Sequence, residues 1–310
     1  MLNGKDLLGL RDASAEDITA ILDLAECFKQ KLGSHEDCSG VLKGKTMFTL
    51  FYENSTRTRA SFELAGKNLG ATEVNISAST SSVQKGESLI DTGKTLQALK
   101  ADFIAIRHPM GGAPALLAKT VNCSVLNAGD GMNEHPTQAL LDMLSFREHF
   151  GKFKGLKVAI LGDIKHSRVA KSNLFGLSKM GAEVWVYGPK TLIPKGFEEL
   201  GAHVATSREE CVEGAHAVMG LRIQLERQSG GLFPSLSEYS RFYGVNDEVM
   251  RLADRDAIVM HPGPVNRGVE LSAQLIDGES SRIEDQVTSG LAVRMAVLKL
   301  LAEYREANGL

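Results

Sequence analysis

Short apolar segments rich in β-branched and aromatic residues alternate along this chain with segments of helical periodicity, and this alternation restricts the fold strongly. In the first half the strand candidates are TMFTLF (46–51), ATEVNIS (71–77), ADFIAIRH (101–108) and CSVLNAG (123–129). Helical stretches such as residues 87–100 separate them. Strands and helices that alternate in this way form a parallel sheet covered on both faces, so the sequence predicts an α/β fold.

Several segments also carry the end signals of helices. Residues 15–32 place apolar side chains at helical spacing after Ser14, which is a suitable N-cap. The helix predicted over 135–150 has Pro136 at a position that the first turn tolerates. A helix that begins near residue 56 is expected to stop at Gly70, and an amphipathic helix is predicted over 289–307.

The alternation starts again after GKFKG (151–155), with strand candidates at 156–163, 182–189, 215–221 and 256–264. At 310 residues the chain is long for one compact core, so two domains are expected. We place the first at residues 1–150 and the second at residues 151–287, each a doubly wound parallel sheet. Ligands of such sheets bind beyond the carboxyl ends of the strands, which is where chemistry should be sought.

Composition excludes several classes of function. The net charge of −3 argues against general nucleic-acid binding, which needs a basic face. The four cysteines form no CxxC pair and are expected to be reduced and mostly buried, and no Cys/His spacing indicates a metal. No segment approaches 18 uninterrupted apolar residues and the N-terminus lacks a signal-peptide pattern, so a cytoplasmic protein without a membrane segment is expected.

The first strand-to-helix junction, STRTR (55–59), combines three hydroxyls with two guanidiniums on one helical turn. That turn already carries unpaired N–H groups and the positive end of the helix dipole. An ordinary N-cap followed by two solvated arginines is one interpretation. The other is a phosphate site, because hydroxyls, N–H groups and arginine forks are what a phosphate binds.

Two further junctions carry candidate groups. Arg107 leaves a strand end in IRHP, and His135 and Gln138 lie three residues apart after the Gly-containing turn DGMNE. Each could be an ordinary charged or helix-entry residue. Taken together they predict a site of cationic and neutral donors without a nucleophile or a metal, suited to direct transfer between two bound substrates.

Other motifs narrow the alternatives. Walker-type GxxxxGK[ST], GxGxxG and GxSxG are all absent, which argues against a nucleotide loop, a nicotinamide-dependent oxidoreductase and a serine hydrolase. The polar segment 77–88 contains Lys85 and is either a mobile surface loop or a lid whose lysine meets an anion.

The motifs STRTRASFE (55–63), KGES (85–88), IRHP (106–109), DGMNEHPTQALLD (130–142) and HPGPVNRG (261–268) occur in this order and together resemble the aspartate/ornithine carbamoyltransferases. The resemblance implies two α/β domains, one for carbamoyl phosphate and one for the amino acid. It also implies that a C-terminal helix, about residues 288–310, packs back on the first domain.

The resemblance further implies site residues. The phosphate of carbamoyl phosphate would be bound by Ser55, Thr56, Arg57 and Thr58, and the carbamoyl group by Arg107, His135 and Gln138, with Gly263 and Pro264 nearby. Thr58, Arg107 and a neutral His135 would donate to the carbamoyl oxygen, so Arg57, Thr58, Lys85, Arg107 and His135 would be catalytic. Ser81 and Lys85 would come from the neighbouring subunit of a homotrimer. No cofactor and no metal are implied.

The amino-acid acceptor follows from charge. Aspartate brings a second carboxylate, whereas ornithine brings a side-chain ammonium. The second domain offers the cationic and polar side chains Arg168, Arg222 and Gln224. Together with Lys85, these residues match the family's aspartate-binding residues. LRIQLER and HPGP stand where ornithine enzymes carry SMG and HCLP stretches. Pro262 and Gly263 would present backbone carbonyls to the α-amino group and the carbamoyl nitrogen.

The expected reaction is therefore carbamoyl transfer from carbamoyl phosphate to L-aspartate, giving N-carbamoyl-L-aspartate and phosphate in pyrimidine biosynthesis. Two rivals stay open: a carbamoyltransferase for ornithine or a related amino acid, and a catalytically silent anion-binding scaffold. Association with dihydroorotase or with a regulatory chain is not decided by the sequence.

Overall fold

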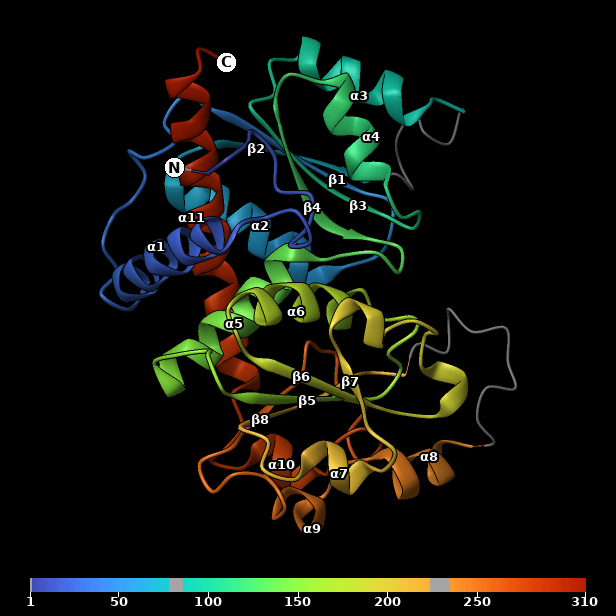
Figure 1. Ribbon diagram of the computed structural model, residues 1–310. Coiled ribbons are helices and arrows are strands. Elements are labelled where there is room, and N and C mark those ends of the chain that lie inside the picture. The colour runs from blue at the N-terminus through green and yellow to red at the C-terminus, as the bar shows by residue number, and fades with distance from the viewer. Residues whose placement is uncertain (1, 78–85, 224–234) are drawn as a thin grey trace. The chain divides into compact units, whose positions relative to one another are not determined.

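The computed structural model (Figure 1) describes residues 2–77, 86–223 and 235–310. The chain forms two compact units, one of residues Met1–Leu144 with Thr288–Leu310 and the other of residues Ser145–Val287. The chain passes from the first unit to the second within helix α5 (Pro136–Phe150), just before the segment 151–155.

The first unit is built on a parallel sheet whose strands have the order β2-β1-β3-β4. These strands are β1 (Thr46–Phe51), β2 (Thr72–Ser77), β3 (Phe103–His108) and β4 (Ser124–Asp130). β1, β3 and β4 are almost entirely buried because both faces of the sheet are covered, whereas β2 forms a more exposed edge. The four strands lie where the apolar segments predicted them.

Helices cover both faces of this sheet (Figure 1), and its parallel strands are joined through them. Besides α5, these helices are α1 (Ala15–Gly33), α2 (Thr56–Leu69), α3 (Leu89–Ala98) and α4 (Ala113–Thr120). Leu96 of α3 and Leu117 of α4 pack with Phe48, Ile104 and Val125 of the strands in one apolar cluster. α2 packs against β1 and β2 and buries Phe62 and Leu69.

Two predicted helix end signals in this unit, Ser14 and Gly70, are confirmed. Ser14 caps α1 through a capping box with Asp17, in which the Ser14 hydroxyl accepts from the Asp17 N–H. α2 ends at Gly70, whose φ of 87° is the left-handed conformation that glycine adopts without a Cβ clash.

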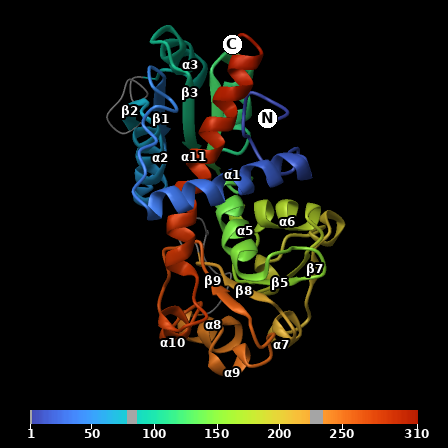
Figure 2. The ribbon, with the colours of Figure 1, turned by 90° about the vertical axis from the view of Figure 1, so that its left-hand side faces the viewer.

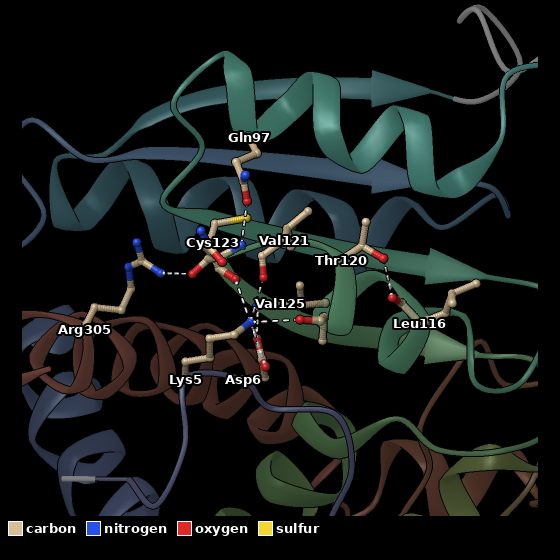
Figure 3. A network of polar contacts seen from close by, with 11 residues as sticks. Lys5, Asp6, Gln97, Leu116, Thr120, Val121, Cys123, Val125 and Arg305 are labelled. Carbon is tan, nitrogen blue, oxygen red and sulfur yellow. Dashed lines mark hydrogen bonds and ion pairs between the residues drawn. The ribbon is translucent and has the colours of Figure 1, made fainter. Parts of the chain in front are cut away.

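The C-terminal helix α11 (Ile283–Ala307) packs on the first unit, as the resemblance implied. Lys29 of α1 donates to the Ser289 hydroxyl over 3.0 Å, and Figure 2 shows α1 crossing α11. Near the end of α11, Arg305 donates to the carbonyl of Asn122 over 2.7 Å (Figure 3). Lys5 donates to the carbonyl of Ala118 in the last turn of α4 and to those of Val121 and Cys123 in the loop that follows, so both chain ends are fixed at the α4–β4 connection.

The second unit contains a parallel sheet of order β7-β6-β5-β8-β9. Its strands are β5 (Lys157–Leu161), β6 (Glu183–Tyr187), β7 (His203–Val204), β8 (Ala217–Gly220) and β9 (Ile258–Met260). Its helices are α6 (Arg168–Lys179), α7 (Arg208–Val212), α8 (Leu236–Tyr243), α9 (Asp247–Met250) and α10 (Ala273–Asp277), with short 3-10 segments at Lys190–Leu192 and Glu198–Leu200. The prediction of a second doubly wound parallel sheet is therefore confirmed.

Two other expectations can be compared with the described residues. Cys38, Cys123 and Cys211 are buried and Cys27 is exposed, and all four are free thiols. In the part of the chain that the structure describes, no helix is both long enough and apolar enough to cross a membrane.

Candidate active site

In the first unit, the strand order places the STRTR junction beside Arg107. The sheet order reverses between β1 and β3, and ligands of open parallel sheets bind at the carboxyl ends of the strands at such a reversal. Phe51 at the end of β1 lies opposite Arg107 near the end of β3, and the Tyr52 N–H donates to the Arg107 carbonyl over 2.9 Å. Residues 55–59 follow directly, so the predicted phosphate residues and Arg107 share one edge of the sheet.

The start of α2 differs from an ordinary capped helix start. Ser55 occupies the N-cap position with extended backbone, but its side chain makes no capping hydrogen bond, and the first turn holds no acidic residue. Arg57 is exposed, whereas Arg59 lies 3.9 Å from Glu63 in a local ion pair one turn along the helix. The positive end of α2 thus keeps its hydroxyls and the Arg57 guanidinium at the strand edge.

Arg107 is held by a carboxylate that sequence reasoning missed. Its Nε donates to Oε2 of Glu53 over 3.1 Å, and both side chains are largely buried. Glu53 lies in the β1–α2 connection, only two residues before Ser55. The Glu53 carboxylate orients the Arg107 guanidinium beside the predicted phosphate site. Its position just before STRTR was the signal by which the sequence could have indicated it.

His108 follows Arg107 in a setting that disfavours its charged form. Burial lowers the pKa of His108, its ring lies 4.6 Å from that of Tyr52, and its Nδ1 accepts from the Met110 N–H over 3.1 Å. The ring therefore packs at the strand end and fixes the turn that follows β3.

A buried polar network fixes the turn that carries His135. Asp130 accepts from the Asn127 side chain over 2.8 Å and from the Glu134 N–H over 3.0 Å, and Glu134 in turn accepts from the Leu10 N–H over 2.7 Å. The Gly131 N–H donates to the His108 carbonyl over 2.8 Å, which joins this turn to the end of β3. The structure thus brings the His135 turn to the same edge as Arg107.

His135 and Gln138 lie at the start of α5. His135 is only 3% exposed, and its carbonyl accepts from the Gln138 N–H over 3.0 Å. The Gln138 side-chain nitrogen donates to Asp142 over 2.9 Å. This bond fixes the orientation of the Gln138 amide and therefore the position of its side-chain oxygen. Asp142 is a further residue that the sequence did not single out.

The second unit repeats the arrangement at its own reversal of strand order, between β5 and β8. Leu161 at the end of β5 lies opposite Gly220 at the end of β8, and the Leu221 N–H donates to the Leu161 carbonyl over 2.8 Å. Arg168 is the first residue of α6 after β5, and Arg222 follows β8. The two predicted arginines therefore belong to neighbouring strand ends.

Local contacts fix the backbone beside each of these arginines. The Ser167 hydroxyl caps α6 by accepting from the Ala170 N–H over 3.1 Å, and Arg168 is 4% exposed. The Ile223 N–H, directly after Arg222, donates to the buried Glu270 over 3.2 Å. Burial raises the pKa of Glu270, against the lowering effect of its hydrogen bonds.

The segment after β9 reaches the same edge of the second sheet. The Gly263 N–H donates to Nδ1 of His261 over 2.8 Å, and the His261 N–H donates to the Gln286 side chain over 3.0 Å. Gly263 and Pro264 are joined by a cis peptide bond. His261 was not among the predicted site residues and acts here as a support of the turn.

Some predicted residues cannot be placed. Ser81, Lys85 and Gln224 lie outside the described residues. Within the described ranges, no group of three or more His, Cys, Asp or Glu side chains is arranged to hold a metal ion.

A hollow of about 630 Å³ lies elsewhere in the second unit. His149, His216 and Arg282 are among its lining residues, together with residues 256–258 at the amino end of β9. Because it lies at the amino ends of the strands, opposite the reversal edge, we do not assign the chemistry to it.

Comparison with known proteins identifies relatives over nearly the whole chain. Residues 5–148 match the profile described as the aspartate/ornithine carbamoyltransferase carbamoyl-P binding domain, and residues 154–301 match that of the Asp/Orn binding domain. The chain is 63% identical over 307 residues to the aspartate carbamoyltransferase catalytic subunit of Ruminiclostridium cellulolyticum, covering 99% of this chain and 98% of that protein. It is 59% identical over 301 residues to the catalytic subunit of the same name from Acetivibrio thermocellus, covering 97% and 96%.

Solved structures share the fold. Aspartate transcarbamoylase from Trypanosoma cruzi in complex with N-(phosphonacetyl)-L-aspartic acid superposes with a TM-score of 0.88 at 32% identity, covering 96% of each chain. Ornithine carbamoyltransferase from Thermus thermophilus superposes with a TM-score of 0.85 at 30% identity, covering 96% of this chain and 99% of that one. Since proteins named for either amino acid share this backbone, the fold alone does not select the acceptor.

Proposed function

The chain belongs to the aspartate/ornithine carbamoyltransferase family, and from this premise we propose that it transfers the carbamoyl group of carbamoyl phosphate to the amine of L-aspartate. The products are N-carbamoyl-L-aspartate and phosphate, as in pyrimidine biosynthesis. The observation that carries the choice of aspartate is the pair Arg168 and Arg222 at the strand reversal of the second unit. Two guanidiniums suit a dicarboxylate and would repel the ammonium of ornithine.

Carbamoyl phosphate binds, in this proposal, at the start of α2. The N–H groups of the first turn and the hydroxyls of Ser55, Thr56 and Thr58 donate to the phosphate, and Arg57 adds a charge-assisted fork. The absence of an acidic residue from the first turn and of a Ser55 capping bond supports this role. A dianion here also compensates the positive end of the helix dipole.

The carbamoyl group points to the donors at the ends of β3 and β4. The uncharged amine of aspartate attacks the carbamoyl carbon, and negative charge builds on the carbonyl oxygen. Thr58, Arg107 and His135 donate to that oxygen, while Gln138 binds the carbamoyl nitrogen through its side-chain oxygen. The C–O bond to phosphate then breaks, and the departing phosphate accepts the proton of the amine.

Aspartate is held by its two carboxylates. Arg168 and Arg222 each form a fork to a carboxylate, with Gln224 and Lys85 as further donors, and the backbone carbonyls of residues 262–264 accept from the amine. A charge-assisted hydrogen bond contributes about 1.5–3 kcal/mol, so each arginine is expected to matter strongly for aspartate affinity.

The assembly and the domain roles follow from the family resemblance. We assign carbamoyl phosphate to a domain of residues 1–150 with the helix of about 288–310, and aspartate to residues 151–287. Ser81 and Lys85 act in the site of a neighbouring subunit within a cytoplasmic homotrimer. The word "subunit" in the names of the relatives supports an oligomer, and association with dihydroorotase or a regulatory chain is left open.

Acceptor specificity tests the proposal. Purified protein is incubated with carbamoyl phosphate and either L-aspartate or L-ornithine, and carbamoyl aspartate and citrulline are quantified. We expect carbamoyl aspartate alone. Citrulline alone would establish the ornithine alternative, whereas binding of carbamoyl phosphate without either product would establish the silent scaffold.

A further inference from the structure

Arg294 of α11 is a buried cation that touches the helix bearing the proposed phosphate site. Its side chain is 3% exposed, and Nη1 donates to the Ser61 hydroxyl of α2 over 2.9 Å and to the Gly290 carbonyl over 2.8 Å. The guanidinium carbon lies 4.9 Å from the ring centre of Phe62, also on α2. Arg294 thus contacts α2 through two consecutive residues, Ser61 and Phe62.

The charge of Asp142 on α5, which is 2% exposed, also acts on this guanidinium. Burial lowers the pKa of Arg294 to about 10 and the charge of Asp142 opposes this effect, so the guanidinium stays charged near neutral pH. Asp142 also accepts from the Gln138 side chain over 2.9 Å. Electrostatic attraction between Arg294 and Asp142 therefore links the Arg294–Ser61 hydrogen bond with the Gln138–Asp142 hydrogen bond.

Ser61, at one end of this link, lies one turn from proposed substrate contacts. Ser61 is three residues after Thr58 and four after Arg57, which is the spacing of neighbours on one helix face. Gln138 is itself a proposed carbamoyl contact. Since a buried cation is expensive and an apolar side chain could fill the space, packing alone does not account for an arginine here.

We propose that Arg294 is a positioning residue, which fixes the start of α2 relative to Gln138 by bridging α2 and α5 from the C-terminal helix. This inference rests on the proposed function, because it takes Arg57, Thr58 and Gln138 as substrate contacts. The C-terminal helix then serves the carbamoyl phosphate site as well as the packing of the first unit.

A matched pair of variants separates positioning from stability. Arg305 is a second buried arginine on α11, 8% exposed, but it donates to the Asn122 carbonyl at the α4–β4 loop (Figure 3). Arg294→Met and Arg305→Met both remove a buried charge and keep an unbranched side chain. Both should lower Tm, whereas only Arg294→Met should raise the KM for carbamoyl phosphate and the Kd for inorganic phosphate, by roughly tenfold or more, because a small misplacement of binding groups is costly.

Ser61→Ala keeps the test decisive if Arg294→Met fails to fold. It deletes only the hydrogen bond from Arg294 to Ser61 and keeps the contact with Phe62, so we expect little change in Tm and a rise of a few-fold in the KM for carbamoyl phosphate. The KM for aspartate at saturating carbamoyl phosphate should stay near that of the wild type in every variant.

The inference is overturned if Ser61→Ala leaves the KM for carbamoyl phosphate and the Kd for phosphate unchanged. It is equally overturned if a folded Arg294→Met differs from Arg305→Met in neither constant. Failure of the proposed function has a different signature, namely a wild-type protein that forms no carbamoyl aspartate. In that case the phosphate Kd of the variants still reports whether Arg294 positions the start of α2.

Discussion

Glu73 on the edge strand β2 carries a carboxyl group that is poorly suited to ionisation. Both carboxyl oxygens are buried and have no hydrogen-bond partner among the described residues. The group lies against α2 at Gly66, so close that a Cβ there would overlap Oε1, and it faces Glu63 and Lys67 of the same helix. The pKa of Glu73 is raised from 4.5 to about 8, mainly by burial and also by the charge of Glu63. The charge of Lys67 acts in the opposite direction.

Stability should therefore fall as the pH rises from about 4.5 through about 8. Over that interval the folded chain holds a proton that the unfolded chain has released, so unfolding is favoured by each increase in pH. At about 1.4 kcal/mol per pH unit, the raised pKa costs the folded state at most about 1.4 kcal/mol at pH 5.5 and about 4–5 kcal/mol at pH 8.5. Movement of the carboxyl toward water reduces this cost, so Glu73→Gln should gain about 1–3 kcal/mol at pH 8.5.

Calorimetry at two pH values tests this expectation. Glu73→Gln should raise Tm by roughly 3–8 °C at pH 8.5 and by clearly less at pH 5.5. Glu306→Gln, at an exposed glutamate near the end of α11, is the control and should shift Tm little at either pH. A gain of the same size at both pH values, or a loss at pH 8.5, would refute the reasoning.

Three substitutions test the proposed substrate contacts. Arg57→Ala should lower kcat/KM for carbamoyl phosphate by about 10³-fold with little change in Tm, because an exposed fork to the phosphate is lost. Arg222→Ala should raise the KM for aspartate by about 10–100-fold and leave the Kd for phosphate unchanged; an exchange of these two effects would contradict the assignment of the two substrates. His135→Ala should lower kcat by roughly 10²–10³-fold as one of several donors to the carbamoyl oxygen, and an unchanged kcat would remove it from that role.

Hydrophobic periodicity predicted the long elements of the fold but missed several of the short ones. β1, β3, α2 and α5 have enough residues for a period of two or 3.6 to be read, and they occur where predicted. β7 has only two residues and α9 only four, which is too few for any period. α4 was missed although Gly112 at its N-cap and Pro114 in its first turn were usable signals.

Helix starts were predicted to within a residue where a cap was visible, and less well elsewhere. α1 begins at Ala15, as predicted, because Ser14 provides the cap. α11 begins at Ile283, before the predicted residue 289, since its first turn holds acidic residues and lies outside the apolar run. These differences do not move any predicted site residue to another element.

The candidate site depended on information that periodicity does not contain. The order β2-β1-β3-β4 places the loops after β1 and β3 side by side, and only pairing between distant segments determines that order. The Glu53–Arg107 pair joins residues 54 positions apart, and Arg294 reaches Ser61 across 233 positions. Short motifs identified the proposed substrate-binding residues. The residues that hold them in place could be identified only from the fold.

A crystal structure of the wild-type protein with a non-hydrolysable phosphonate analogue of carbamoyl phosphate tests the central claim most directly. We predict that the phosphonate lies at the start of α2, within hydrogen-bond distance of the N–H groups of residues 56–58 and of the Arg57 guanidinium. A phosphonate bound at Arg168 or Arg222, with the start of α2 in contact with solvent alone, would contradict the assignment of the anion site and with it the proposed reaction.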